Sequence, residues 1–315
     1  MSLEHTTAMA KYTRILVILN PSAGQQSADE TRQIIETRMA AEQVAYELRT
    51  TEGAGDALHW AEAAPGEGFD LVVAAGGDGT IMEAMSGLIR SKSEVPLAQL
   101  PAGTANLLAR AVTIPTDLEE ALDVVFTGYV APFDVGYLPE QERYFALVAG
   151  CGYDAKLIAG ATRPLKNALG FAAYVVSGLK NLFTLRKAWI ELIVDDERRV
   201  FRANTVMIAN VGQFGEKTPK LGDNIHPHDG KLDVIIAKAS SVRGALNIML
   251  RILTGRFTGH SDLEYLSASR ISIVTKPTMP TEIDGEVLGT TPLRIEAVPN
   301  GARLVVPQSY RPPEE

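Results

Sequence analysis

The most constraining feature of this sequence is a series of short apolar segments, each closed by a turn and followed by a helical pattern. Arg14–Leu19, Asp70–Ala75 and Val95–Leu100 are apolar, and Val44–Thr50 alternates like a strand. Helical patterns occupy Ser27–Ala41, Gly55–Ala64, Thr80–Arg90, Thr104–Val112 and Asp117–Phe126. Near-continuous apolar strands that alternate with helices are typical of a parallel sheet covered on both faces. The chain before Pro132 therefore predicts an α/β domain.

The pattern changes near Pro132, where strands begin to follow one another without a helix between each pair. The expected strands are Tyr144–Ala149, Ala188–Val194, Val200–Asn210, Leu232–Lys238, Ser269–Val274 and Leu293–Glu296, with helical inserts at Leu157–Phe183 and Val242–Leu253. This half predicts mainly antiparallel β structure. A length of 315 residues is enough for two domains, and we expect their boundary within residues 130–136. The final strand, Ala302–Val306, fits either half.

Composition excludes several classes of protein. Lys and Arg number 30 against 38 Asp and Glu, and the net charge of −8 argues against duplex nucleic acid as the main partner. The single cysteine, Cys151, forms no internal disulfide and no thiolate zinc site, which favours a reducing compartment. No segment reaches the roughly 20 apolar residues that cross a bilayer, and the N-terminus lacks the apolar region of a signal peptide. We therefore expect a cytoplasmic protein, with peripheral contact at the inner face of the membrane left open.

The most informative turn is Gly76-Gly77-Asp78-Gly79-Thr80, which lies between an apolar strand and a helix. Glycines let backbone N–H groups turn toward an anion, and the following helix N-terminus adds partial positive charge. A carboxylate beside phosphate requires a cation between them, so Asp78 predicts Mg²⁺ here. The alternative is a tight turn in which Asp78 caps the helix.

Two further strand ends carry similar turns, Asn20-Pro21-Ser22-Ala23-Gly24 and Pro101-Ala102-Gly103-Thr104-Ala105-Asn106. Each alone is also compatible with an ordinary turn, but parallel strands bring all three loops to one edge of the sheet. Thr104 and Asn106 offer a hydroxyl and an amide at an expected helix start. No Gly-Lys-Ser/Thr follows any of these loops, and no GxGxxG opens the first helix, so a Walker A protein and an ordinary dinucleotide dehydrogenase are disfavoured.

Two acidic turns lie in the second half of the chain. In Glu282-Ile283-Asp284-Gly285-Glu286, an extended backbone would place Asp284 and Glu286 on one side, where paired carboxylates take a proton and hold a metal. The alternative is a hairpin turn at Asp-Gly. In the segment from His226 to Asp233, Asp229 and backbone carbonyls suit a hard cation, although a solvated turn fits equally. His226 and His228 lack a third soft ligand and do not indicate zinc.

Together, these motifs resemble the bacterial lipid kinases of the diacylglycerol kinase and sphingosine kinase group. The shared residues are Asn-Pro-x-x-Gly, Gly-Gly-Asp-Gly-Thr, Pro-x-Gly-Thr-x-Asn, Asp229-Gly-x-Leu-Asp233 and Ile283-Asp-Gly-Glu286, in the same order over Ile15–Val306. Gly-Gly-Asp-Gly-Thr by itself is also similar to NAD kinases and phosphofructokinases. The resemblance implies an α/β nucleotide-binding domain over residues 1–134 with a returning strand at about 297–315. It also implies a β-sandwich lipid-substrate domain over residues 135–296.

The resemblance also implies the roles of individual residues. ATP would contact Asn20–Gly24, Gly76–Thr80, Thr104 and Thr50 at an interdomain cleft. Asp284 would accept the proton of the lipid hydroxyl, while Asp229 and the carbonyls near His226 and Lys231 would hold a structural Mg²⁺. Arg110 matches an arginine of the family that is able to touch a phosphate. Leu107, however, stands after Asn106 where related diacylglycerol kinases have an aspartate of the metal and substrate network.

The expected reaction is transfer of the ATP γ-phosphate to a lipid hydroxyl, with Mg²⁺ held through Asp78 and Glu286. A basic and apolar span without acidic residues supports contact with an anionic membrane surface; its cations are Lys156, Arg163, Lys166, Lys180, Arg186 and Lys187. The alternative for that span is a core helix with solvated lysines. An NAD kinase-type phosphotransferase and a non-catalytic nucleotide- or lipid-binding regulator are the alternative functions. The acceptor lipid and the oligomeric state, including a homodimer, stay open.

Overall fold

The computed structural model describes residues 12–24, 27–152, 186–215, 221, 225–253 and 261–311. The expected helical insert Leu157–Phe183 lies outside these residues, as do Lys156, Arg163, Lys166 and Lys180. The chain divides into two compact units. Unit 1 comprises Met1–Gly103, Ile114–Ala131 and Arg303–Gln308, and unit 2 comprises Thr104–Thr113, Pro132–Ala302 and Ser309–Glu315. None of the helices in the described ranges is long and apolar enough to span a membrane.

Unit 1 contains the predicted parallel sheet. Its strands β1 (Arg14–Leu19), β2 (Ala45–Thr50), β3 (Leu71–Gly76) and β4 (Leu97–Pro101) lie in the order β2-β1-β3-β4, and every neighbouring pair is parallel. The last residues of β16 (Leu293–Val306) add a further parallel pairing, Leu304 with Leu97. All of β3 is buried, as the continuous apolar pattern requires.

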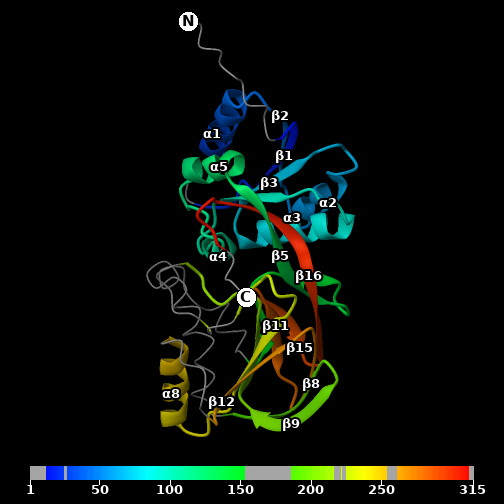
Figure 1. Cartoon of the computed structure of the whole chain (residues 1–315), viewed down its shortest axis with the longest axis vertical. Coiled ribbons are helices and arrows are strands. Elements are labelled where there is room, and N and C mark those ends of the chain that lie inside the picture. The colour runs from blue at the N-terminus through cyan, green and yellow to red at the C-terminus, as the bar shows by residue number, and fades with distance from the viewer. Residues whose placement is uncertain are drawn as a thin grey trace, which may run out of the picture. The chain divides into compact units, whose positions relative to one another are not determined.

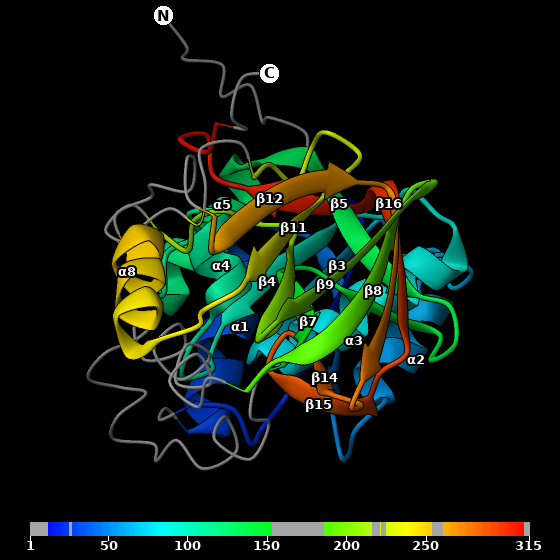
Figure 2. The ribbon, with the colours of Figure 1, turned by 90° about the horizontal axis from the view of Figure 1, so that it is seen from below.

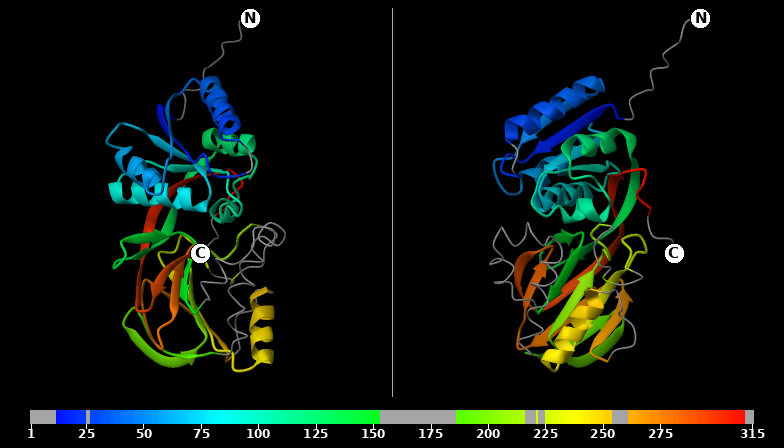
Figure 3. Two further views of the ribbon diagram at one scale, coloured as in Figure 1. Left: turned by 180° about the vertical axis from the view of Figure 1, so that it is seen from behind. Right: turned by 90° about the vertical axis from the view of Figure 1, so that its left-hand side faces the viewer.

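Helices cover both faces of this sheet (Figures 1 and 3). α1 (Ala28–Ala41) and α5 (Leu118–Thr127) lie on one face, and α2 (Asp56–Ala63) and α3 (Asp78–Ser91) lie on the other. α1 begins with a capping box, in which the Ser27 hydroxyl and the Glu30 carboxylate each accept a backbone N–H of the other residue. Gly87 lets α3 approach α2 closely, because a Cβ there would lie 2.2 Å from the Leu58 carbonyl oxygen.

Unit 2 is built mainly from antiparallel strands, as predicted, and Figure 2 shows β11 beside β12 and β8 beside β9. One sheet has the order β12-β11-β10-β7-β14-β15. In the other, β16 is followed by β13, β8 and β9, while β5 pairs with β16 and β6 pairs with β5. Side chains of both sheets, among them Phe145, Ile208 and Ile273, form one buried core. The strands are β5 (Tyr129–Leu138), β6 (Arg143–Phe145), β7 (Val148–Cys151), β8 (Ala188–Val194), β9 (Glu197–Ala203), β10 (Thr205–Ala209), β11 (Leu232–Ala237), β12 (Leu263–Ala268), β13 (Arg270–Lys276), β14 (Pro280–Ile283) and β15 (Glu286–Thr290), with helices α4 (Leu107–Ala111) and α8 (Val242–Leu253).

Three strand predictions were wrong at their boundaries. Tyr144–Ala149 is divided between β6 and β7, because the N–H groups of Ala146 and Leu147 donate to the Asp284 carboxylate. Val200–Asn210 is divided at Asn204, where the chain passes from one sheet to the other. Leu293–Glu296 and Ala302–Val306 belong to one strand, β16, despite the turn-like residues between them. In each case a tertiary contact overrides the local pattern.

Candidate functional site

The loops that follow β1 and β3 are tied together by Asn20. Its side-chain amide donates to the Thr80 hydroxyl at 2.9 Å, and its backbone N–H donates to the Ala75 carbonyl oxygen at 2.9 Å. Its side-chain oxygen accepts the N–H of Ser22 at 2.9 Å. Pro21 and Ser22 are exposed beside this contact, and Ala23 is half-buried. The two loops therefore form one surface at the carboxyl edge of the sheet.

The loop after β4 joins the same surface. The Ala102 N–H donates to the Gly76 carbonyl oxygen at 2.9 Å, and Gly103 approaches Gly77. Gly24 has φ +87°, and a Cβ there would lie only 2.4 Å from the Ala102 carbonyl oxygen. The strand order reverses between β1 and β3, which is where open α/β sheets bind their ligands. The predicted convergence of three loops is thus present as far as Gly103.

No side chain caps the N-terminus of α3. Gly77 occupies the N-cap position and has no side chain to satisfy the first backbone N–H groups of the helix. Nothing lies within 4 Å of a Cβ placed on Gly79, whereas a Cβ on Gly76 would meet Thr80 at 2.7 Å. Asp78 is the first residue of α3 rather than its cap, so the interpretation of this loop as an Asp-capped turn was wrong. A helix N-terminus that no side chain caps, with one adjacent carboxylate, suits a phosphate and its cation.

Four other residues that were expected to contact the nucleotide lie outside the packed parts of these three loops. Thr50 ends β2, and its hydroxyl accepts the Arg32 guanidinium at 2.6 Å. The expected helix Thr104–Val112 begins only at Leu107, so Thr104 is exposed in the preceding turn rather than at a helix start. Asn106 is 7% exposed with φ +48°, and Arg110 is exposed and donates to the Ala105 carbonyl oxygen at 2.9 Å. These last three residues belong to unit 2.

Asp284 occupies the tip of the β14–β15 hairpin. Its φ of +45° and the +85° of Gly285 form a two-residue turn, so the expected extended backbone was wrong and the hairpin alternative is confirmed. The Asp284 carboxylate nevertheless accepts three backbone N–H groups, those of Ala146 (2.9 Å), Leu147 (3.0 Å) and Val148 (2.9 Å). This carboxylate is therefore held in a fixed orientation. Glu286 is exposed and pairs with Arg143 at 2.6 Å.

Glu282, two residues before Asp284, is a candidate that the sequence analysis did not select. It is 3% exposed, and its Oε2 atom has no hydrogen-bond partner. Burial, and then the charge of Asp284, raise the pKa of Glu282 to about 7. Strand alternation was the signal in the sequence that could have drawn attention to Glu282. Ile283 faces the core, so Glu282 beside it must point to the opposite face of β14. Two carboxyl groups of different environment therefore lie together in this hairpin.

Asp229 supplies the one carboxylate in the loop between His226 and Lys231. Asp229 is exposed, and its Oδ1 accepts the Lys231 N–H at 2.9 Å, which draws the carboxylate toward the Lys231 backbone. Within the described ranges, no three His, Cys, Asp or Glu side chains group as metal ligands. One carboxylate with carbonyls and waters fits Mg²⁺, which retains several waters in proteins. His228 packs against Phe133 and hydrogen-bonds Tyr310 through Nε2, and burial lowers its pKa.

Asp134 is a second residue that the sequence analysis missed. It is 1% exposed, and its two carboxylate oxygens accept the N–H groups of Asn300 and Gly230, each at 2.7 Å. Asn210 donates to the carbonyl oxygens of Asp134 and Ala146, both at 2.7 Å. Asp134 thus links the loop of Asp229 to β16, and Asn210 links β5 to the segment that holds Asp284. A single Asp inside an apolar strand was the available signal.

Comparison with known proteins agrees with this architecture. The family model of the diacylglycerol kinase catalytic domain matches residues 14–138, and that of the YegS C-terminal NAD kinase beta sandwich-like domain matches residues 147–306. Over 287 residues the chain is 32% identical to a diacylglycerol kinase of Bacillus subtilis (strain 168), covering 89% of this chain and 91% of that protein. The chain belongs to the bacterial diacylglycerol kinase catalytic domain family.

Other members of this family are similar over most of their length. A diacylglycerol kinase of Staphylococcus aureus (strain bovine RF122 / ET3-1) is 29% identical over 282 residues, covering 89% of this chain and 88% of that protein. The crystal structure of a diacylglycerol kinase from Bacillus anthracis (strain Sterne) superposes with a TM-score of 0.74 at 23% identity, covering 96% and 99% of the two chains. The latter likeness concerns the fold. Family membership implies ATP as phosphate donor and a lipid as substrate.

Proposed function

We propose that this protein transfers the γ-phosphate of ATP to the hydroxyl group of a lipid alcohol, with diacylglycerol as the first candidate. The observation that carries this proposal is the packing of the loops after β1, β3 and β4 at the point where the strand order reverses, beside the N-terminus of α3, which no side chain caps. The names of the relatives direct the choice of acceptor.

The phosphates of ATP would lie against the Asn20–Gly24 loop and against the backbone N–H groups at the start of α3, within Gly76–Thr80. These groups are fixed before the nucleotide arrives, because Asn20 holds Thr80 and Gly76 holds Ala102. Phosphoryl transfer depends mainly on positioning and on charge stabilisation, which fixed N–H groups supply. When bound, Mg²⁺ would neutralise phosphate charge beside Asp78, and we propose a second, structural Mg²⁺ at Asp229 with the carbonyls of His226 and Lys231.

On the acceptor side, Asp284 would take the proton of the lipid hydroxyl. Its three N–H donors fix the carboxylate orientation, and general base catalysis requires such positioning. The demand on the base is small, since proton transfer occurs late in a loose transition state. Thr50, Thr104, Asn106 and Arg110 remain proposed nucleotide contacts, and Glu286 remains a proposed partner of the metal.

A lipid acceptor must be reached at a membrane, so we propose peripheral contact with an anionic lipid surface. Most of the basic span expected to make that contact lies outside the described residues. Within them, the Lys187 ammonium donates to the Lys238 carbonyl oxygen (2.6 Å) and the Ser240 hydroxyl (2.7 Å). Lys187 is therefore engaged within unit 2, and its neutralisation would disturb the fold together with any membrane contact.

The proposed activity is tested by phosphate transfer from labelled ATP to a panel of lipids in mixed micelles, with NAD as a parallel acceptor. We expect label in a lipid, first of all in diacylglycerol, and its loss in the Asp284→Asn variant. Label in NADP would contradict the proposal and favour an NAD kinase-type enzyme. ATP binding without any transfer would favour a non-catalytic regulator.

A further inference from the structure

The outer face of the β9-β8-β13 strands carries exposed apolar side chains. β8 alternates strictly, so that Ile190 and Leu192 enter the core while Trp189 points outward. Trp189 is 56% exposed, Val200 of β9 is 54% exposed and Val274 of β13 is 42% exposed. The strand register places Val200 and Val274 on either side of the position next to Trp189, because both pair with Glu191. The three side chains therefore form one patch, which we call the Trp189 face.

Cations surround this patch. Arg202 of β9 and Lys276 of β13 are the two residues paired with Trp189, and both are exposed. The Arg202 guanidinium carbon lies 5.7 Å from the centre of the Trp189 ring. Glu191 is the one acidic residue on the outward positions of these three strands, and it is neutralised by Arg198 at 2.7 Å. A protein of net charge −8 thus presents a basic face around an exposed tryptophan.

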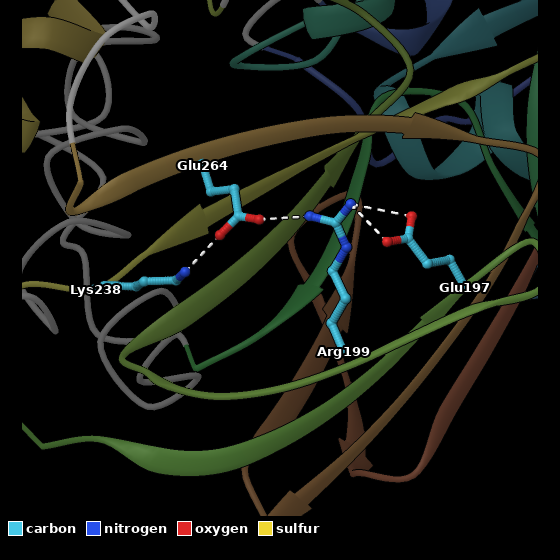
Figure 4. Close-up of polar contacts among 4 residues, drawn as sticks. All are labelled: Glu197, Arg199, Lys238 and Glu264. Carbon is cyan, nitrogen blue, oxygen red and sulfur yellow. Dashed lines mark hydrogen bonds and ion pairs between the residues drawn. The ribbon is translucent and has the colours of Figure 1, made fainter.

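The opposite side of β9 is anchored by an ion-pair network (Figure 4). Arg199 donates to Glu264 of β12 at 2.7 Å and to both carboxylate oxygens of Glu197, and Lys238 also pairs with Glu264. The Lys238 ammonium lies 4.7 Å from the centre of the Phe201 ring. β9 is therefore fixed to the neighbouring sheet, and its outward side chains form a firm platform.

We propose that the Trp189 face docks this protein on an anionic lipid bilayer. The inference rests on the proposed function, because a lipid acceptor lies in a membrane. Tryptophan prefers the level of the lipid head groups, and each basic residue near an anionic membrane adds about 1 kcal/mol to binding. Trp189 enters the interface, while Arg202 and Lys276 contact lipid phosphates.

A second copy of the chain fits this face less well. A stable protein interface buries about 800 Å² on each partner, which a patch of three apolar side chains does not provide. Two-fold pairing of the face would also bring the same excess of positive charge together from both copies. An anionic bilayer, by contrast, complements that charge.

Tryptophan fluorescence tests the proposal directly, because the chain has only Trp60 and Trp189. In a Trp60→Phe background, phosphatidylglycerol vesicles should shift the Trp189 emission to shorter wavelength, and phosphatidylcholine vesicles should not. The double variant Arg202→Gln/Lys276→Gln should weaken vesicle binding about 30-fold, which corresponds to about 2 kcal/mol. The matched control is Arg90→Gln/Lys92→Gln, two exposed cations at the end of α3, and it should bind like the parent.

The inference is overturned if anionic vesicles leave the emission unchanged, or if the control variant loses as much binding as Arg202→Gln/Lys276→Gln. It is also overturned if Trp189→Ala dissociates a dimer in sedimentation, since the face would then join two copies. Vesicle binding is measured without turnover, so it does not depend on phosphate transfer. Trp189→Ala should retain full transfer to a short-chain, water-dispersed diacylglycerol. Absence of transfer in the parent protein would instead contradict the proposed function alone.

Discussion

The two units hold their candidate residues by different physical means. In unit 1 the loops are shaped by backbone contacts and by glycines that leave no room for a side chain, as at Gly24 and Gly76. In unit 2 the corresponding positions are set by carboxylates, and Asp134 and Asp284 each accept two or more backbone N–H groups. Steric fit therefore shapes the loops of unit 1, and charge-assisted hydrogen bonding fixes the two carboxylates of unit 2.

This difference has a chemical meaning. A phosphate site needs donors and no added negative charge, so fixed N–H groups and glycines serve it well. A site that accepts a proton needs carboxylates whose environments separate their proton affinities. Glu282, with a pKa of about 7, lies two residues from Asp284, and burial likewise raises the pKa of Asp233 to about 6.

The largest effect should come from Asp134→Ala in unit 2. The substitution leaves the N–H groups of Gly230 and Asn300 without their charged acceptor in a partly buried setting, so the free energy of unfolding should fall by roughly 3–5 kcal/mol. The measurement is urea unfolding. Asp196→Ala is the matched control, because its side chain is 94% exposed, and it should change stability by less than about 0.5 kcal/mol. Equal stability of Asp134→Ala and Asp196→Ala would contradict the claim that carboxylate hydrogen bonds stabilise unit 2.

The effect of Glu282→Gln on the free energy of unfolding should depend on pH. Folding raises the pKa of Glu282 from 4.5 to about 7. Between these two pH values the folded protein binds a proton that the unfolded protein has lost, so wild-type stability falls as the pH rises from about 4.5 to about 7. The variant lacks this equilibrium, so its stability relative to wild type should rise by roughly 3 kcal/mol across the window. Urea unfolding at several pH values measures this difference.

The exposed Glu94→Gln is the control for that series, and its stability relative to wild type should stay within about 0.5 kcal/mol at every pH. A flat difference for Glu282→Gln as well would mean that Glu282 is ionised in the folded protein throughout. Glu282 and Asp284 would then not differ in proton affinity in the way that their environments indicate.

The smallest effect should come from Gly76→Ala in unit 1. A Cβ at Gly76 would meet the Thr80 side chain at 2.7 Å, so we expect a loss of roughly 1–3 kcal/mol in unfolding free energy. Gly79→Ala in the same loop meets nothing within 4 Å and should be neutral or slightly stabilising. The melting temperatures of Gly76→Ala and Gly79→Ala are compared by thermal unfolding. A loss confined to Gly76→Ala would support steric fit at that position. An equal loss in both variants would mean that the loop tolerates no substitution.

The sequence predicted unit 1 well because its information is local. Apolar strands, the Ser27–Glu30 capping box and the glycine turns each act within a few residues, and parallel pairing then brings the loops together. In unit 2 the same reasoning selected Asp284 as a candidate but assigned it an extended backbone, since its hairpin is stabilised by residues 136 to 138 positions away. Asp134 and Glu282 were missed because their burial arises only when distant strands pair.

The most direct test of the account compares ATP affinity and turnover in Asp284→Asn and wild type. An asparagine side chain keeps one acceptor oxygen but turns an NH₂ group toward at least one backbone donor, so a melting temperature must confirm that the variant is folded. We expect a fall in kcat of about 10²–10⁴-fold, with the Kd for ATP changed less than about twofold. Wild-type turnover in Asp284→Asn, or a loss of ATP affinity as large as the loss of kcat, would contradict the proposal that Asp284 acts in catalysis and not in ATP binding.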